Sequence, residues 1–205
     1  MLNRHRRFKK DTLIFLIGLV IFTGLNIFSA FTMELHSDEA YYWIYSKFPS
    51  FGYFDHPPMI AWLIMAGRFI LNGEIGVRIM IILLSTFSMI VLWRMAKRYS
   101  TDALLFWALV YSVILIQPYS FIATPDAPLL FFSILFFYFY SRYLEKNNFQ
   151  NTVLLAFIIA LMIYSKYHAF LLLGFVILSN FKIIKRFSFW VIIILATIYL
   201  LPHIF

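Results

Sequence analysis

The chain has 205 residues, of which 63% are hydrophobic and only 13% are Asp, Glu, Lys or Arg, and it contains no cysteine. This composition excludes a soluble globular domain and a disulfide framework, and it is typical of an integral membrane protein. We assign the formal net charge of +8 to orientation in the membrane and to contact with anionic lipid headgroups, and we expect no nucleic-acid partner.

Residues 12–32 are predicted to form the first transmembrane helix. A bilayer core of about 30 Å takes roughly 20 apolar residues of helix, and this stretch supplies them directly after a basic tail over residues 1–11. A secretory signal peptide also begins with basic residues, but its apolar region is shorter and a small-residue cleavage site follows it. No such site precedes Glu34, so we predict an uncleaved span with the N-terminus in the cytoplasm.

Residues 33–73 are predicted to form a long outer loop that carries two interfacial helices. The segment 40–48 is rich in Tyr and Trp, which favour the headgroup level of a membrane. The segment 57–71 is apolar but too short to cross, is interrupted by an arginine, and begins with two prolines that fit a first helical turn. We expect the two helices to frame Asp55 and His56.

Six further apolar segments in residues 74–205 bring the predicted number of spans to about seven. With the N-terminus inside, thirteen of the seventeen Lys and Arg residues fall on the cytoplasmic side, as the positive-inside rule expects. One long helix over residues 152–181 is the alternative for the fifth and sixth spans, but it would carry the basic residues 182–186 to the outer face. The sequence therefore predicts an all-α, polytopic transmembrane protein with a single domain over residues 1–205. The six segments are 74–95, 104–119, 128–140, 152–165, 169–181 and 187–205.

Acidic residues gather on the predicted outer face. A carboxylate placed just past the end of a span loses part of its hydration and becomes a stronger base. Asp38 and Glu39 are therefore candidates for taking a proton from a hydroxyl or amine acceptor at the membrane surface. The alternative is that Asp38 caps a short helix and that Glu39 favours the positive N-terminal end of that helix. The outer acidic residues are Glu34, Asp38, Glu39, Asp55, Glu74 and Asp126.

Asp55 and His56 stand directly before two prolines, which hold the preceding backbone extended and aim both side chains. An adjacent carboxylate and imidazole are candidates for binding a divalent metal or a phosphate, and the alternative is a histidine that is only hydrogen-bonded. Asp126 and Lys166 lie at the outer mouths of later spans, where an ionisable group is a functional candidate. For these two the alternatives are a helix cap and a lysine that reaches the headgroups.

Five motifs occur along the chain in a characteristic order: Asp-Glu-Ala-Tyr-Tyr-Trp, Gly-Tyr-Phe-Asp-His-Pro-Pro-Met, Gly-Glu-Ile-Gly-Val-Arg, Thr-Pro-Asp-Ala-Pro-Leu and Ser-Lys-Tyr-His. In these motifs the chain resembles the GT-C membrane glycosyltransferases of the protein O-mannosyltransferase and aminoarabinose transferase superfamily. The resemblance covers nearly all of residues 1–205. It implies an enzyme that moves a sugar from a polyprenyl-phosphate donor, undecaprenyl phosphate in bacteria, to a lipid, glycan or protein acceptor at the periplasmic face of the inner membrane.

The same resemblance implies roles for individual residues. It puts the catalytic base at Asp38, with Glu39 beside it, and Asp126 at the second acidic position of the family. Asp55 falls where relatives place a carboxylate near a divalent ion, which makes Asp55 and His56 candidate metal ligands. The implied reaction is an inverting displacement in which Asp38 accepts the proton of the acceptor. The residues that the resemblance aligns with donor-phosphate or other basic positions are His56, Lys166 and Arg78.

Members of this superfamily usually continue for several more spans and often a soluble domain, so we expect the 205 residues to be their N-terminal portion. An inactive homologue that serves as an assembly subunit is one alternative to an enzyme. A membrane transporter that uses Asp38, Asp55 and Asp126 as a relay is another. Transport predicts ionisable groups near the middle of the membrane and a path to both faces.

Overall fold

The computed structural model describes residues 2–204, and it describes side chains from Lys10 to His203. The side chains of most of the predicted basic tail, and the last residue of the final predicted span, lie outside this range. Within the described range the regular structure is helical. The α-helices are α1 (Leu2–Thr32), α2 (Ser37–Ser46), α3 (Met59–Ile70), α4 (Gly73–Ala96), α5 (Ala103–Ser112), α6 (Ile116–Tyr119), α7 (Asp126–Glu145), α8 (Phe149–Ser165), α9 (Ala169–Ser179) and α10 (Phe187–Ile204). Two short 3₁₀ helices are η1 (Lys97–Tyr99) and η2 (Phe181–Lys185).

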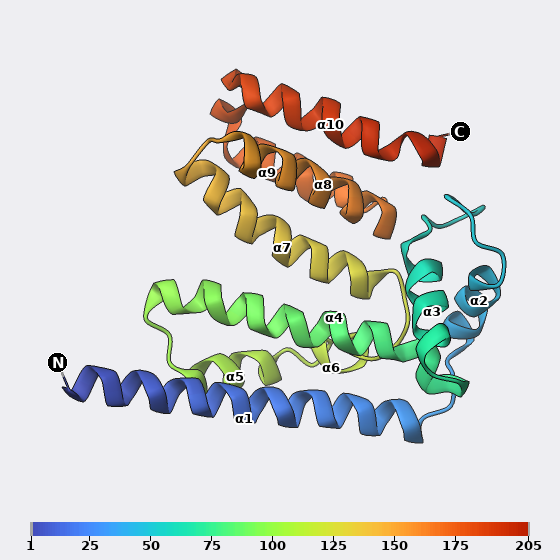
Figure 1. Ribbon diagram of the computed structural model, residues 1–205, viewed down its shortest axis with the longest axis horizontal. Helices are drawn as coiled ribbons and strands as arrows, with labels where there is room; N and C mark the ends of the chain where they lie inside the picture. Colours follow the sequence, from blue (N-terminus) through green and yellow to red (C-terminus); the bar gives the residue numbers. More distant parts are fainter. Residues whose placement is uncertain (1, 205) are drawn as a thin grey trace.

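The long helices form a row in which α1, α4, α7, α8 and α10 lie side by side (Figure 1). Helix α5 packs against α1, and α9 packs against α8. Two large apolar clusters hold the row together, one among α7 to α10 and one among α1, α4 and α5. Helices α2 and α3 lie across one end of the row, where α3 packs on α4.

Among the described residues, three helices are long and apolar enough to cross a membrane: Lys10–Thr32, Gly73–Tyr99 and Asp126–Glu145. Large apolar side chains remain exposed on the outside of these helices, for example Val20 and Phe28 on α1. Lipid stabilises such surfaces by covering them, whereas in water this apolar area would stay exposed to solvent. The all-helical fold with several spanning helices confirms a polytopic helical membrane protein, while the count of about seven spans stays a prediction.

The third predicted span, residues 104–119, is not a continuous helix. Helix α5 ends at Ser112, Val113 is extended, and the chain resumes as the four-residue α6. Pro118 explains the break, because its nitrogen carries no hydrogen and its ring would clash with the carbonyl of Ile114 in a continuous helix. The fifth and sixth predicted segments, in contrast, are two separate helices as expected, since the chain turns between Ser165 and Ala169.

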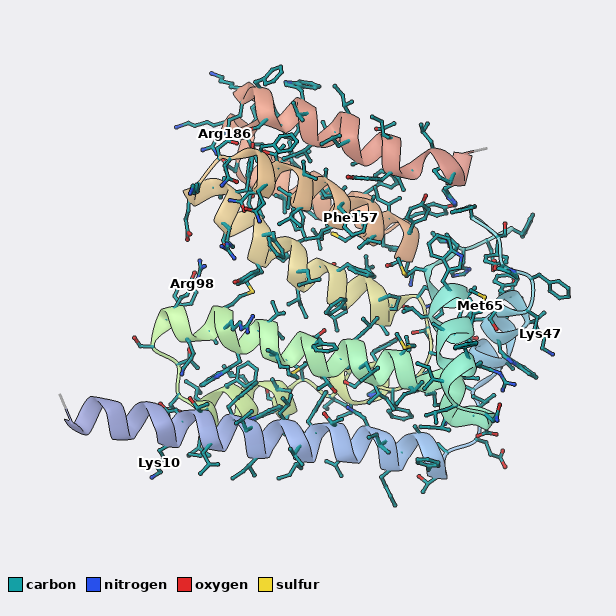
Figure 2. The ribbon with its side chains drawn as sticks, viewed as in Figure 1. Lys10, Lys47, Met65, Arg98, Phe157 and Arg186 are labelled. Carbon is teal, nitrogen blue, oxygen red and sulfur yellow. The ribbon has the colours of Figure 1, made fainter. Side chains whose placement is uncertain are left out.

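The connections between helices separate into two groups at opposite ends of the row (Figure 1). One end, which we call the site end, holds residues 33–58, the α6–α7 connection and the α8–α9 turn. The other end, which we call the basic end, holds the α4–α5, α7–α8 and α9–α10 connections, and Figure 2 shows Arg98 and Arg186 there. The sequence therefore predicted correctly which loops share an end.

Helix α3 forms within the predicted segment 57–71 but begins at Met59, so Pro58 is its N-cap and the two prolines precede its first turn. Its inner face, with Ile60 and Ile64, is fully buried in a cluster with α2, α4 and the start of α7, whereas Phe69 on its outer face is 93% exposed. This amphipathic pattern fits a helix that lies at the membrane interface.

We predict that Gly67→Ala destabilises the protein. A methyl group at Gly67 would meet the carbonyl oxygen of Gly76, so the backbones of α3 and α4 would have to separate. Overpacking of this kind costs about 1–3 kcal/mol, and thermal unfolding in detergent should begin at a lower temperature. Gly24→Ala is the matched control, because nothing lies within 4 Å of an added methyl there. Equal unfolding temperatures for the two variants would contradict the packing described for α3 and α4.

Candidate active site

A buried ion pair joins α2 to α4 at the site end. The side chain of Glu39, in the first turn of α2, has no exposed surface, and that of Arg78, near the start of α4, is 1% exposed. Arg78 Nη2 donates to Glu39 Oε2 at 2.6 Å, and Arg78 Nε donates to Glu39 Oε1 at 2.8 Å. Two parallel charge-assisted bonds fix the orientation of both side chains.

The remaining N–H groups of Arg78 bind the C-terminal end of α1. Nη1 donates to the carbonyl oxygens of Ala30 and Met33 at 3.0 and 2.6 Å, and Nη2 donates to the carbonyl of Glu34 at 2.8 Å. All five donors of the guanidinium are thus used inside the protein. This geometry leaves no donor for a phosphate, so it does not support the expected contact of Arg78 with the donor substrate, and we assign Arg78 a positioning role.

The carboxylate oxygens of Glu39 likewise accept hydrogen bonds only from groups inside the protein. Besides its two bonds from Arg78, it accepts the backbone N–H of Ala123 at 2.9 Å and that of His36 at 2.9 Å. Burial alone raises the pKa of Glu39, but the bonds from Arg78, Ala123 and His36 outweigh burial and hold the pKa below its ordinary value. A carboxylate that is ionised and fully bonded serves to position its neighbours rather than to accept a proton from a substrate.

Asp38, one residue earlier, faces outward with 62% of its side chain exposed. The N-cap of α2 is His36, whose Nδ1 accepts the N–H of Asp38 at 3.3 Å, and Glu39 completes the capping box. The expected cap role of Asp38 is therefore taken by His36. The protein also leaves this carboxylate largely open rather than partly desolvated as we expected. Among residues 10–203 no side chain donates a hydrogen bond to its oxygens, so they are accessible to a substrate.

Asp55 lies in the loop between α2 and α3, where two tyrosine hydroxyls donate hydrogen bonds to its carboxylate. Tyr45 donates to Oδ1 at 2.7 Å and Tyr41 donates to Oδ2 at 3.1 Å, while the two hydroxyl oxygens lie in contact with each other. Burial alone raises the pKa of Asp55, but these bonds and the adjacent His56 outweigh burial and place the pKa below its ordinary value. Asp55 is therefore an ionised, fixed carboxylate.

His56 lies between Asp55 and Tyr42. Its Nδ1 is 3.1 Å from Asp55 Oδ2, out of line for a hydrogen bond, and its Nε2 is 3.3 Å from the hydroxyl of Tyr42. The imidazole ring meets the Tyr42 ring edge to face at 5.3 Å. When protonated, this histidine would form an ion pair with Asp55 while its side chain stays 25% exposed.

Tyr42 lies at the centre of the predicted site residues. Burial raises its pKa, and the carboxylates of Asp38, Asp55 and Asp126 raise it further, to about 12. The Tyr42 hydroxyl lies 3.3 Å from His56 Nε2, beside Asp55, and the Tyr42 side chain belongs to the same buried cluster as Ala127, the residue after Asp126. The structure therefore brings segments that carry three of the predicted acidic residues together near one tyrosine.

Asp126 and Lys166 form a close ion pair between the start of α7 and the α8–α9 turn. Lys166 Nζ lies 2.7 Å from Oδ1 and 2.8 Å from Oδ2 of Asp126, and the lysine side chain is 23% exposed. Asp126 makes no side-chain cap for α7, and Lys166 is bonded within the protein instead of reaching for headgroups. Both alternatives for these residues are thereby answered by the structure.

An apolar groove of about 580 Å³ runs from Asp126 along the outside of α7. The segment around α6, including Tyr119, and Leu172 of α9 also line this groove. A second apolar cavity, of about 330 Å³ between α7 and α10, has no charged side chain in its lining. Only the first of these two spaces joins an apolar wall to an ion pair of the site.

Asp55 and His56 do not form a complete metal site. Among the described side chains, no group of three or more His, Cys, Asp or Glu residues is placed to hold a metal ion. Protein zinc sites use three or four such ligands, and both oxygens of Asp55 already accept tyrosine hydroxyls. The residues present do not fit a divalent ion by themselves, and we derive no reaction step from one.

The sequence did not reveal Tyr41, Tyr42 and Tyr45 as site residues, because aromatic residues in this loop fit the headgroup belt equally well. The spacing of Tyr41 and Tyr45, four residues apart in a helix, was the available signal, since it places both hydroxyls on one face. We name the whole set the vestibule: Asp38, Tyr41, Tyr42, Tyr45, Asp55, His56, Asp126 and Lys166.

The fold and the vestibule together define a class: a polytopic helical membrane protein that gathers carboxylates, a histidine and a lysine at one end, beside an apolar groove. A family model described as dolichyl-phosphate-mannose-protein mannosyltransferase matches residues 55–205. The chain belongs to this family of GT-C membrane glycosyltransferases, as its motifs indicated. No curated protein and no solved structure matches the chain. Asp38 and Glu39 precede the matched range, whereas Asp55, Asp126 and Lys166 lie inside it.

We predict that Arg78→Met lowers the free energy of unfolding by about 3–5 kcal/mol, because it leaves Glu39 buried without its ion partner. The double variant Glu39→Gln/Arg78→Met should lose less than the sum of the two single variants, since neither charge is then stranded. Thermal unfolding of the four proteins in one detergent measures this coupling. Strict additivity would show that the pair is not a unit.

We predict that Glu39 accounts for part of the loss of stability in acid. Its folded pKa lies below the ordinary value of 4.5, so the stability it contributes is complete above that pH and is lost as the pH falls through the folded pKa. Glu39→Gln has no such proton to bind, and its unfolding temperature should fall less steeply from about pH 5 to about pH 3. Parallel acid curves for the two proteins would contradict the lowered pKa.

Proposed function

We propose that the protein transfers a sugar from a polyprenyl-phosphate donor to a hydroxyl or amine acceptor on a lipid, glycan or protein. The observation that carries this proposal is the junction of the apolar groove with the Asp126–Lys166 pair, at the same end of the protein as the open carboxylate of Asp38. A polyprenyl-phosphate sugar has the matching parts, namely a long apolar chain, an anionic phosphate and a sugar.

The groove suits the prenyl chain, and Lys166 suits the phosphate. The lining of the groove is apolar apart from Asp126, Tyr119 and Ser133. A prenyl chain is a hydrocarbon that needs no hydrogen-bond partners, so it suits such a lining. Lys166 is held at the groove mouth by Asp126 but stays 23% exposed. An ammonium with three donors can keep the carboxylate and still donate to a phosphate oxygen.

Asp38 is the proposed base. Its carboxylate is open, and the buried Glu39 fixes the turn of α2 that carries it. The acceptor would bring a hydroxyl or amine to Asp38, which takes the proton as the acceptor atom attacks the anomeric carbon.

The proposed reaction is an inverting displacement. The bond from the acceptor atom to the anomeric carbon forms while the bond to the phosphate oxygen breaks, and polyprenyl phosphate leaves with the electron pair. Phosphate is a good leaving group, so the site contributes mainly by stabilising negative charge. Lys166 and, in its protonated form, His56 are placed to supply that stabilisation.

We infer that the site end faces the periplasm and that the N-terminus lies in the cytoplasm of a cell with this protein in its inner membrane. The separation of the acidic vestibule from the basic end supports this orientation (Figure 2). The transporter alternative has less support, because the two charged side chains that are buried among residues 10–203 are Glu39 and Arg78, which pair with each other at the site end.

We predict that Asp38→Asn lowers the transfer rate by about a hundredfold or more, because the base contributes at least that factor. Membranes containing the full chain would be supplied with radiolabelled polyprenyl-phosphate sugars, and label in the acceptor fraction would be counted. Glu34→Gln is the matched control, since Glu34 is an exposed carboxylate four residues away. Unchanged transfer by Asp38→Asn would contradict the base, and wild-type membranes inactive with every donor would favour an assembly subunit.

We predict that Lys166→Met weakens binding of polyprenyl phosphate by about tenfold or more, through loss of one charge-assisted contact. Lys166→Arg keeps the charge and should retain most of the binding. Competition by unlabelled polyprenyl phosphate against labelled donor measures the change. Equal binding by Lys166→Met and the wild type would place the phosphate elsewhere.

A further inference from the structure

A polar pocket of about 490 Å³ lies at the basic end, between the C-terminal end of α7 and the first turn of α8. Six of its eight lining residues are polar or charged, and the pocket shares no residue with the apolar groove. We propose that this pocket binds a phosphate group, carried by the headgroup of an anionic membrane lipid. The site is separate from the vestibule, and the proposal does not depend on the proposed function.

The turn that forms the pocket is held in place by two asparagines. Asn148 caps α8 by accepting the N–H of Asn151 at 2.9 Å. The side chain of Asn151, itself 8% exposed, donates to the carbonyl of Lys146 at 2.8 Å and to that of Arg142 at 3.4 Å. These bonds tie the first turn of α8 to the last turn of α7, so the two basic side chains start from a fixed backbone.

The charge of the pocket is positive. Arg142 and Lys146 both line it, whereas the carboxylate of its one acidic residue, Glu145, is neutralised by Arg98 at 2.9 Å. The first turn of the 17-residue α8 adds partial positive charge from its unpaired N–H groups. The guanidinium of Arg142 and the ammonium of Lys146, which line the same pocket, suit the oxygens of a phosphate, because a guanidinium donates two parallel hydrogen bonds and an ammonium acts as a point charge.

The position of the pocket favours a lipid as the source of the phosphate. It lies at the level of the helix connections where Figure 2 shows Arg98. Lipid headgroups are expected at this level, where the row of long helices ends. Two apolar side chains beside it point outward, Leu144 at 37% and Phe149 at 79% exposure. Acyl chains can cover these side chains while the headgroup phosphate reaches Arg142 and Lys146.

The test is binding of defined lipids to the full chain purified in detergent, followed by native mass spectrometry. Phosphatidylglycerol, phosphatidylcholine and inorganic phosphate are the three probes. The pocket variant is Arg142→Gln/Lys146→Gln, and the control Lys182→Gln/Lys185→Gln removes the same charge from exposed residues of the same end that do not line the pocket. A third variant, Arg142→Lys/Lys146→Arg, keeps the charge and verifies that a loss is not misfolding.

We expect one phosphatidylglycerol to bind the wild type, the control and the charge-keeping variant, with affinity about tenfold lower for the pocket variant. Phosphatidylcholine, which is neutral overall, should bind weakly to all four proteins. If inorganic phosphate binds the wild type and phosphatidylglycerol binds no more tightly, the phosphate site would stand, but a lipid as the source of the phosphate would be overturned. Equal loss in the pocket variant and the control would overturn the proposal, because it would show only diffuse attraction by the basic end.

Discussion

The bond network of Glu39 and Arg78 is the constraint on which the rest of the site end depends. Moving two charges out of water is costly, and the cost is met only when nearly every donor and acceptor finds a partner. Arg78 meets this condition by binding the end of α1, and Glu39 meets it by binding the backbone at His36 and Ala123. Three regions that are distant in sequence, namely residues 30–39, Arg78 and Ala123, are thereby joined, and the vestibule is built around this network.

The hydrogen-bond network of Glu39 and Arg78 also explains where the reactive groups lie. Successive residues of a helix point about 100° apart, so once Glu39 is buried, Asp38 must turn toward the outside. Ala123, bound to Glu39, lies three residues before Asp126, and this carries Asp126 and its partner Lys166 to the same place. The groove begins at Asp126, so the buried pair indirectly sets the distance between the proposed base and the proposed donor site.

Much of this organisation was readable from sequence, and the failures have physical causes. Apolar segments and basic residues predicted most of the helices, including the two short ones between the first two spans, and the loops that share an end. The place of those two helices at the membrane interface stays a prediction. The prediction of a continuous third span was wrong because Pro118 interrupts the helix even though the apolar run of residues is continuous. The motifs located the acidic residues but could not separate their roles, because Asp38 and Glu39 differ in burial and not in chemistry. For Arg78 too the motif alone was insufficient, since only the fold shows that its five donors have partners inside the protein.

The proposed function requires that a polyprenyl-phosphate donor lies in the groove with its phosphate at Lys166. A cryo-electron microscopy structure of the full chain in a nanodisc, held by an antibody fragment and saturated with polyprenyl phosphate, tests this claim most directly. We predict density for the phosphate within hydrogen-bond distance of Lys166 Nζ and for the prenyl chain along α7 beside α6. A phosphate bound away from Lys166, with the chain in the cavity between α7 and α10, would contradict it.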